Sequence, residues 1–168
     1  MKSSILFLIA TLMCGTASAH NRSQQMECDH MQDVQHRGDQ AMGFDHMKTT
    51  HHFLLSSTGG AIQVRANEAS DEEGIKQIRM HLGHITKMFS DGNFEIPMLV
   101  HSQVPPGAET MKQLKAKIAY KYQEIDRGAK VVISSDDPAA LKAIRDFLTF
   151  QITDHQTGDP LSVEGSRN

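Results

Sequence analysis

Side chains that bind soft metal ions are concentrated in one short polar stretch, residues 20–52. Most other residues of this stretch are small, polar or charged. Such side chains there include His36 and Met42, and the candidate metal ligands chosen from the stretch are Met26, Cys28, His30, Met31, His46, Met47, His51 and His52. Thioether, imidazole and thiolate groups suit copper and zinc. Because the stretch has too little apolar content to bury these groups in a core of its own, we expect it to bind metal.

A second set of candidate ligands lies on one flank of a predicted amphipathic helix. At about 100° per residue, His81, His84 and Met88 lie close together beside the apolar stripe. Two imidazoles and a thioether form a three-ligand edge suited to copper, whereas zinc prefers a carboxylate or thiolate in place of methionine. The alternative is a packing role, because His81 and His84 align with Phe147 and Phe150 in the second half of the chain.

Known catalytic motifs do not occur among these residues. The run from His81 to His84 lacks both the glutamate and the spacing of a helical zinc-hydrolase motif. His155 suits the negative end of a helix, and His101 follows an apolar run as a polar stop. We therefore expect no catalytic residues, and an enzyme with His81, His84 or His155 as base is the third-ranked alternative.

The first 19 residues have the pattern of a cleavable export signal. Lys2 precedes a short apolar run over residues 5–13, and an Ala-Ser-Ala cleavage site follows at residues 17–19. The apolar run is shorter than the roughly 20 residues that span a bilayer. A lipoprotein signal at Cys14 fits less well. We expect a periplasmic or secreted protein.

The charge balance and the cysteine content limit which binding partners the sequence predicts. The chain has 17 Lys and Arg against 20 Asp and Glu side chains, and no basic stripe that would indicate a nucleic-acid partner. No later segment predicts stable membrane insertion. After the signal is removed Cys28 is the only thiol, so it is a metal ligand, a reactive thiol or the link of a disulfide dimer.

The folded region has the pattern of one unit used twice. Each unit is two short strands followed by a helix, at residues 49–57, 61–67 and 71–90, and again at 116–124, 129–134 and 136–157. Ile75 to Arg79 matches Leu141 to Arg145 at a separation of 66 residues. We predict an α+β fold with a duplicated β-β-α unit. It forms a four-stranded antiparallel sheet with two helices on one face and a pseudo-twofold axis. The alternative is an α+β domain whose halves are unrelated.

The remaining segments complete the predicted domain organisation. It comprises a signal peptide at 1–19, a flexible His/Met/Cys-rich segment at 20–47, the duplicated domain at 48–160 and a disordered tail at 161–168. The connector at 94–107 is predicted to be extended, with Pro97 excluding a central strand. A short helical piece is expected around 109–114.

Three motifs resemble an uncharacterised family of small exported bacterial proteins. They are the run Met42-Gly43-Phe44-Asp45-His46 with Thr50-His51-His52-Phe53, the run from Ile78 to Leu82, and Thr157-Gly158-Asp159-Pro160. The resemblance covers Met42 to Pro160. It implies one domain and brings no activity, substrate or catalytic residue.

These patterns predict an exported metal-binding protein, with copper as the expected ion and zinc as the alternative. Its role would be binding, buffering or resistance. The second hypothesis is an exported module that binds a protein partner or a small ligand without metal. An apolar patch on the outer face of the sheet would favour that module, whereas converging His and Met side chains would favour metal.

Overall fold

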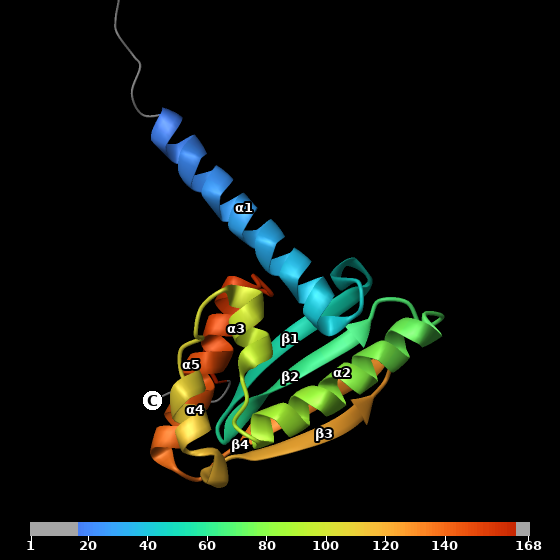
Figure 1. Cartoon of the computed structure of the whole chain (residues 1–168), viewed down its shortest axis with the longest axis vertical. Helices are drawn as coiled ribbons and strands as arrows, with labels where there is room; N and C mark the ends of the chain where they lie inside the picture. Colours follow the sequence, from blue (N-terminus) through green and yellow to red (C-terminus); the bar gives the residue numbers. More distant parts are fainter. Residues whose placement is uncertain (1–16, 164–168) are drawn as a thin grey trace, which may run out of the picture.

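Residues 17–163 are described by a computed structural model (Figure 1). Most of the predicted signal peptide, with Cys14, and residues 164–168 of the predicted tail lie outside them. The elements are α1 (Ala17–Met42), η1 (His46–Lys48), β1 (Thr49–Ser56), β2 (Gly59–Ala66), α2 (Glu72–Ser90), α3 (Glu95–His101), α4 (Ala108–Gln113), η2 (Lys115–Lys117), β3 (Ala119–Ile125), β4 (Gly128–Ser134) and α5 (Pro138–Asp154).

The four strands form one open antiparallel sheet in the order β1-β2-β4-β3, which confirms the predicted α+β class and the four-stranded antiparallel sheet. Phe53, Ile62, Val131 and Tyr122 lie opposite one another across the sheet and form one of its inner rows. Helix α2 packs against β2, β3 and β4, and α5 packs against β1 and β2. The alternation of side chains along each strand therefore places every second residue in the core.

Buried apolar residues of α2, of α5 and of the strands belong to one core cluster. Its largest fully buried side chains include Phe89, Phe147 and Leu148. Leu148 lies so close to β2 that a Cβ on Gly60 would overlap its side chain. Glycine at this position thus lets the helix approach the sheet closely.

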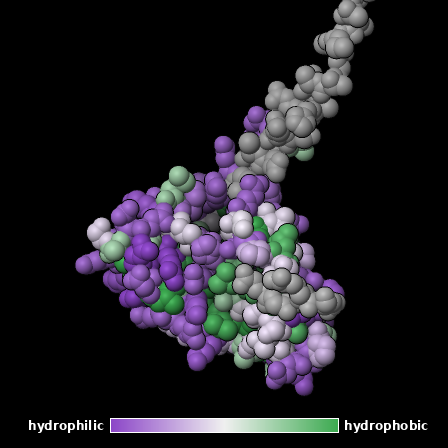
Figure 2. Space-filling view, turned by 180° about the vertical axis from the view of Figure 1, so that it is seen from behind, coloured by the Kyte–Doolittle hydropathy of each residue, from purple (hydrophilic) through white to green (hydrophobic). Residues whose placement is uncertain are grey.

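The opposite side of the sheet is mainly polar. His52, Gln63, Lys130 and Gln123 form one of its rows. Seen from behind, hydrophilic side chains cover most of the molecule, and hydrophobic residues gather in small groups near the centre (Figure 2). The face is mixed in character, as expected for a sheet whose second side meets solvent.

Side-chain caps begin both long core helices at the predicted places. Asp71 accepts a hydrogen bond from the backbone N–H of Gly74 at 3.0 Å, and Asp137 accepts one from Ala139 at 2.9 Å. Pro138 stands at the first position of α5, where its missing N–H costs nothing. These local signals explain why both helix starts were readable from the sequence.

The segment expected to be extended after Phe94 is instead helix α3. Pro97 is the third residue of this helix, and the first N–H groups of a helix have no partner within it. Pro97 is therefore compatible with the helix. In the sequence it argued only against a central strand, not against a helix.

The stretch expected to be flexible also differs, because residues 17–42 form α1. The chain has no proline there and no glycine before Gly38, so nothing interrupts a helix. The C-terminal half of α1 docks on the body through Val34, which is fully buried, and through Arg37, whose Nε donates to the carbonyl of Val100 at 2.7 Å. The N-terminal half projects away from the body (Figure 1). Within residues 17–163, no helix combines the length and apolarity needed to cross a membrane.

Candidate metal centre

Four histidines from four separate segments line one partly open cavity of about 80 Å³. His51 comes from β1, His81 from α2, His101 from the end of α3, and His155 from the residue after α5. We call this space the imidazole cavity. The rest of its lining is mostly apolar, with Gln151 and Met42 as further side chains that carry a heteroatom.

Ordinary strand and helix geometry directs these rings inward. His51 and Phe53 alternate with His52 and Leu54 along β1, so His51 faces the core. His101 is the last residue of α3 and is only 3% exposed. His155 is the C-cap of α5. Each position follows from its own element, but their meeting depends on how the elements pack.

Burial keeps three of the rings neutral near pH 7. The pKa of His51 is lowered to about 4, mainly by burial and then by repulsion from His46 and His52, against an opposing effect of Asp39. Burial likewise lowers the pKa of His81 to about 4, with repulsion from His51 and His84 adding to it.

The pKa of His155 is lowered to about 3, mainly by burial and then by repulsion from His101 and His51. Asp154 opposes this shift. A neutral imidazole has one nitrogen lone pair free to accept a hydrogen bond or coordinate a metal ion.

The fourth ring, His101, is held by two polar partners. Its Nδ1 lies 2.5 Å from Oδ2 of Asp154, and its Nε2 lies 2.9 Å from Oε1 of Gln151. The other carboxylate oxygen of Asp154 lies 3.0 Å from Nε2 of His30 on α1. Burial opposes ionisation of Asp154, but the hydrogen bonds from His30 and His101 lower its pKa overall.

Two polar atoms of the cavity have no partner among the described residues. They are Nε2 of His51 and Nε2 of Gln151, and both are fully buried. Gln151 as a whole is only 4% exposed. Buried polar groups without partners are costly, about 1–3 kcal/mol each, unless a ligand or a water satisfies them.

Aromatic contacts hold the rings in place. Phe44 stacks on His51 at a centroid distance of 6.1 Å and meets His81 edge to face at 5.6 Å. Phe53 stacks on His155 at 5.4 Å, and His101 meets His155 edge to face at 4.9 Å. The imidazoles are therefore part of the packed interior as well as candidate ligands.

A second space, of about 260 Å³, adjoins the imidazole cavity. We call it the outer pocket. Gly38, Met42, His51 and His155 line both spaces and so form the wall between them. His46 lines the outer pocket only.

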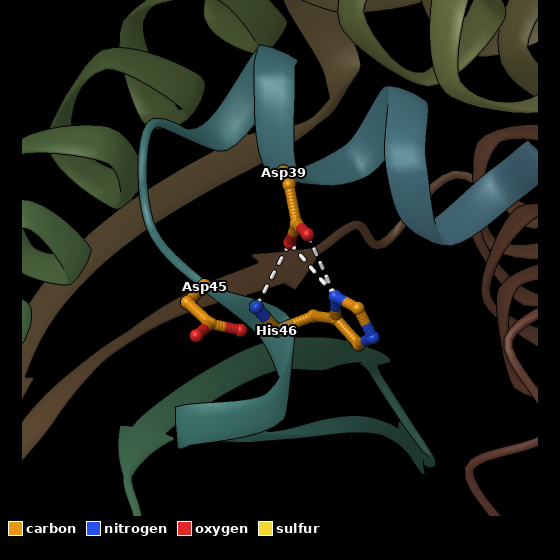
Figure 3. A group of neighbouring side chains, drawn as sticks. All are labelled: Asp39, Asp45 and His46. Atoms are coloured by element: carbon orange, nitrogen blue, oxygen red, sulfur yellow. Dashed lines mark hydrogen bonds and ion pairs between the residues drawn. The ribbon is translucent and has the colours of Figure 1, made fainter. Parts of the chain in front are cut away.

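Close to this pocket, Asp39, Asp45 and His46 form a compact group (Figure 3). Their ligand atoms all lie within 4.8 Å of one another, and among the described side chains no other trio of His, Cys, Asp or Glu meets that limit. The rings of the imidazole cavity are thus spaced more widely than the ligands of a preformed single-ion site.

Hydrogen bonds already engage this compact group. Asp39 accepts from the backbone N–H of His46 at 2.8 Å, and its two oxygens lie 2.9 and 2.8 Å from the ring Nδ1 of His46. Asp45 accepts from the backbone N–H of Met47 at 2.8 Å as the cap of η1. Both carboxylates thus have structural roles, while His46 Nε2 remains on the far side of the ring from Asp39.

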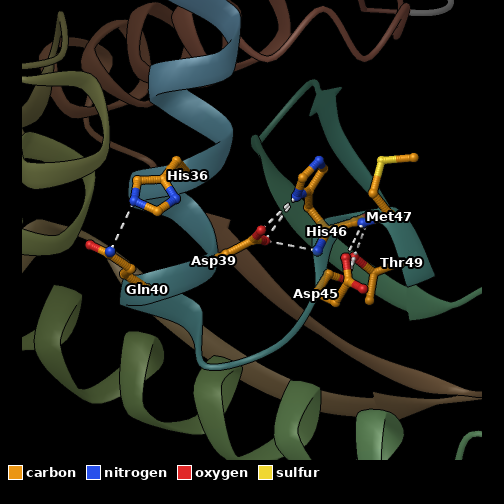
Figure 4. A network of polar contacts seen from close by, with 7 residues as sticks. All are labelled: His36, Asp39, Gln40, Asp45, His46, Met47 and Thr49. Atoms are coloured by element: carbon orange, nitrogen blue, oxygen red, sulfur yellow. Dashed lines mark hydrogen bonds and ion pairs between the residues drawn. The ribbon is translucent and has the colours of Figure 1, made fainter.

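The surroundings of this group are exposed (Figure 4). His36 and Gln40 form a separate pair on α1, with Nε2 of each 3.1 Å apart. The Met47 side chain extends away from the carboxylates and is 73% exposed. The thioether predicted here is therefore not joined to the compact group.

The structure brings together only some of the predicted ligands. His51 and His81 share the imidazole cavity, and His46 lines the adjoining pocket. His84 is exposed and Met88 packs against the hydrophobic core, so the predicted three-ligand flank on α2 is divided between solvent and interior.

The other predicted ligands lie elsewhere. Nδ1 of His52 is 2.8 Å from Oδ1 of Asp159, on the outer face of the sheet. His30 contacts Asp154, and Met26 is 66% exposed on the projecting part of α1. The predictions for Cys28 and Met31 fall on side chains outside the described set.

Sequence reasoning missed three side chains of the cavity, namely His101, Gln151 and His155. Met42 was counted among the soft side chains of residues 20–52 but was not chosen as a candidate ligand. His101 and His155 were interpreted as a polar stop and a helix-end residue, and both do occupy helix ends. Nothing local connects His101 with Asp154, 53 residues later. The only sequence feature that could have indicated a buried position for these two histidines is that each follows a strongly apolar segment.

Comparison with protein families, with curated proteins and with solved structures finds no match to this chain.

Proposed function

We propose that this chain is an exported metal-binding protein whose folded centre is the imidazole cavity, with copper as the preferred ion. The observation that carries the proposal is the convergence of four histidines from four segments on one mostly apolar space. Histidine is the commonest metal ligand in proteins, and copper and zinc both bind imidazole nitrogen.

The protonation state of the rings supports this proposal. The pKa values of His51, His81 and His155 lie well below neutrality, mainly because the rings are buried. An ion would therefore not have to displace protons from these three rings near pH 7. Because the rings are spaced more widely than a bound ion requires, we expect them to turn inward when the ion binds.

The ring of His101 fits the role of a supporting or fourth ligand. Its contact with Asp154 has the arrangement in which a carboxylate orients a metal-binding imidazole. For Nε2 to bind an ion, the side chain of Gln151 would have to turn away.

Copper is favoured over zinc by the thioether of Met42 on the cavity wall. Zinc remains the alternative, because carboxylate and imidazole groups such as Asp39, Asp45 and His46 suit it equally well. The sulfur ligands predicted along α1 would add a capture segment for copper beside the folded centre. Cys28, as a free thiol, would either join that segment or link two chains.

Metal titration of the purified, chelator-treated protein tests the proposal. Competition with chromophoric chelators measures the affinity for Cu(I), Cu(II) and Zn(II) in turn. The variants His51→Gln and His81→Gln remove two cavity ligands while keeping polar side chains of similar size. His84→Gln is the matched control, because His84 is an exposed imidazole on the same helix as His81.

We expect wild type and His84→Gln to bind copper with the same affinity. Each cavity variant should bind at least about tenfold more weakly. Equal binding by all four proteins would show that the ion is held outside the cavity. No binding of any of the three ions by wild type would overturn the proposal as a whole.

A second candidate function is binding of a small molecule without metal. It is favoured by the unpartnered Nε2 atoms of His51 and Gln151, which a ligand with suitable polar groups would satisfy. The mostly apolar lining with a few polar groups is also typical of small-molecule sites. Thermal stabilisation by a library of small polar compounds, in the presence of chelator, would separate this function from metal binding.

For the fold, we infer that the two halves arose by duplication and that α2 and α5 cover the same face of the sheet. The strand order β1-β2-β4-β3 supports this, because it places the two hairpins side by side with β2 and β4 in the middle. The pairing of β2 with β4 is antiparallel, as a pseudo-twofold axis between them requires. Helix α5 next to β1 and β2, and α2 next to β3 and β4, would follow from an exchange of helices across that axis.

A further inference from the structure

We propose that the ion is held at the wall between the imidazole cavity and the outer pocket, by the thioether of Met42 and the imidazoles of His51 and His155, and that it is Cu(I). This inference rests on the proposed function and specifies the ligand set and oxidation state within it. It also adds two residues, Met42 and His155, that were not among the candidate ligands chosen from the sequence.

The position follows from the two spaces. Met42, His51 and His155 are the residues with donor atoms that line both the cavity and the outer pocket. The remaining shared residue, Gly38, has no side chain that could bind an ion. An ion at the wall can thus be reached from the outer pocket and is still surrounded by the buried rings.

One donor at this wall is already available. Nε2 of His51 is buried without a hydrogen-bond partner among the described residues. His155 lines the same two spaces as His51. Two neutral imidazoles approaching from β1 and from the end of α5 suit the low coordination number that Cu(I) accepts.

The oxidation state follows from the charge and softness of the donors. The wall offers a thioether and neutral imidazoles, and no carboxylate lines the imidazole cavity. A divalent ion would bring two positive charges into a mostly apolar space, and the carboxylates of Asp154 and Asp39 outside it are already engaged by His101 and His46, so the charge would be costly. A soft monovalent ion requires less compensation, and thioether ligands select Cu(I).

Carboxylates occur just outside, in the group of Asp39, Asp45 and His46. Oxygen and imidazole donors of this kind suit borderline divalent ions better than Cu(I). The arrangement thus separates a soft site at the wall from harder donors at the surface.

The test replaces Met42 by leucine, which removes the sulfur and nearly preserves volume and apolarity. Met47→Leu is the control, because Met47 is an exposed thioether five residues away that lies outside both spaces. Cu(I) affinity is measured anaerobically near pH 7 by chelator competition, and Zn(II) affinity is measured in parallel. X-ray absorption of the Cu(I)-loaded wild type reports whether sulfur is bound.

We expect Met42→Leu to weaken Cu(I) binding at least about tenfold, to leave Zn(II) binding unchanged, and to remove the sulfur signal. Met47→Leu should match wild type. His155→Gln should weaken Cu(I) binding to a similar extent.

Other outcomes distinguish the two proposals. One outcome is that copper binding needs His51, is unchanged in Met42→Leu and shows only nitrogen ligands. That result would refute the wall site but would leave the proposed function standing. A wild type that binds none of the three ions would refute both. Circular dichroism of each variant shows whether lost binding comes from lost folding.

Discussion

Acid should destabilise this protein well above the pH range in which carboxylates titrate. Three rings in the cavity have pKa values of about 4, about 4 and about 3, whereas an unfolded histidine has a value of 6.5. Below pH 6.5 the unfolded chain therefore binds protons that the folded chain excludes. Since the unfolded state gains these protons, the free energy of unfolding falls as the pH falls from 6.5 toward 4.

The size of the stability loss follows from the pH range in which the unfolded chain, but not the folded chain, binds these protons. One pH unit within it costs about 1.4 kcal/mol for each ring. Between pH 6.5 and pH 5 each ring therefore contributes a loss of about 2 kcal/mol, and the three together contribute about 6 kcal/mol if they act independently. This is comparable with the whole stability of a typical domain, about 5–15 kcal/mol.

The measurement is urea unfolding followed by circular dichroism at about pH 7 and about pH 5, with chelator present to remove metal ions. His81→Phe replaces one titrating ring by an aromatic ring that can keep the contact with Phe44. This variant should lose about 2 kcal/mol less stability between the two pH values than wild type does. His36→Gln, at an exposed position on α1, is the control and should behave as wild type.

Two results would contradict this reasoning. One is a wild type whose free energy of unfolding changes by less than about 1 kcal/mol between the two pH values. The other is a His81→Phe variant with the full loss of wild type. The carboxylates of Asp154 and Asp159 do not confuse the test. Their pKa values are lowered from 3.8, so their contribution to stability is lost only at still lower pH.

Three further predictions concern stability near pH 7, measured by urea unfolding. Leu148→Ala should cost about 2–5 kcal/mol, because this fully buried side chain leaves a cavity between α5 and the sheet; a loss below about 1 kcal/mol would contradict the packing described. Asp137→Ala removes the cap of α5 and should cost about 1 kcal/mol, whereas the exposed neighbour Asp136→Ala should change stability by less than about 0.5 kcal/mol. Gly107→Ala should cost more than about 1 kcal/mol, because Gly107 has φ of 82° and an added Cβ would overlap the carbonyl of Ala143; a variant as stable as wild type would mean that the loop before α4 can move.

Most of the regular elements could be predicted because their signals are local. The alternation along residues 49–56 and the 3-4 spacing from Ile75 to Phe89 both appear within one element. Two helix starts were marked by the acidic residues 71–73 and by Pro138, because acidic side chains and an early proline suit the first turn of a helix. The helix containing Pro97 was missed. Proline disfavours the interior of a strand, but it is tolerated in the first turn of a helix, so Pro97 could not distinguish a helix from an extended connector.

By itself the sequence determined the strands and core helices, the fact that His51 and His52 face opposite sides of the sheet, and a supply of donor atoms suited to copper or zinc. Only the tertiary structure decided which donors meet. His51, His81, His101 and His155 belong to segments separated by 20 to 54 residues, and Met42 joins them from the end of α1. Periodicity assigns a side chain to a face of its own element. Convergence depends on how several elements pack around one space, and no local pattern in the chain records that arrangement.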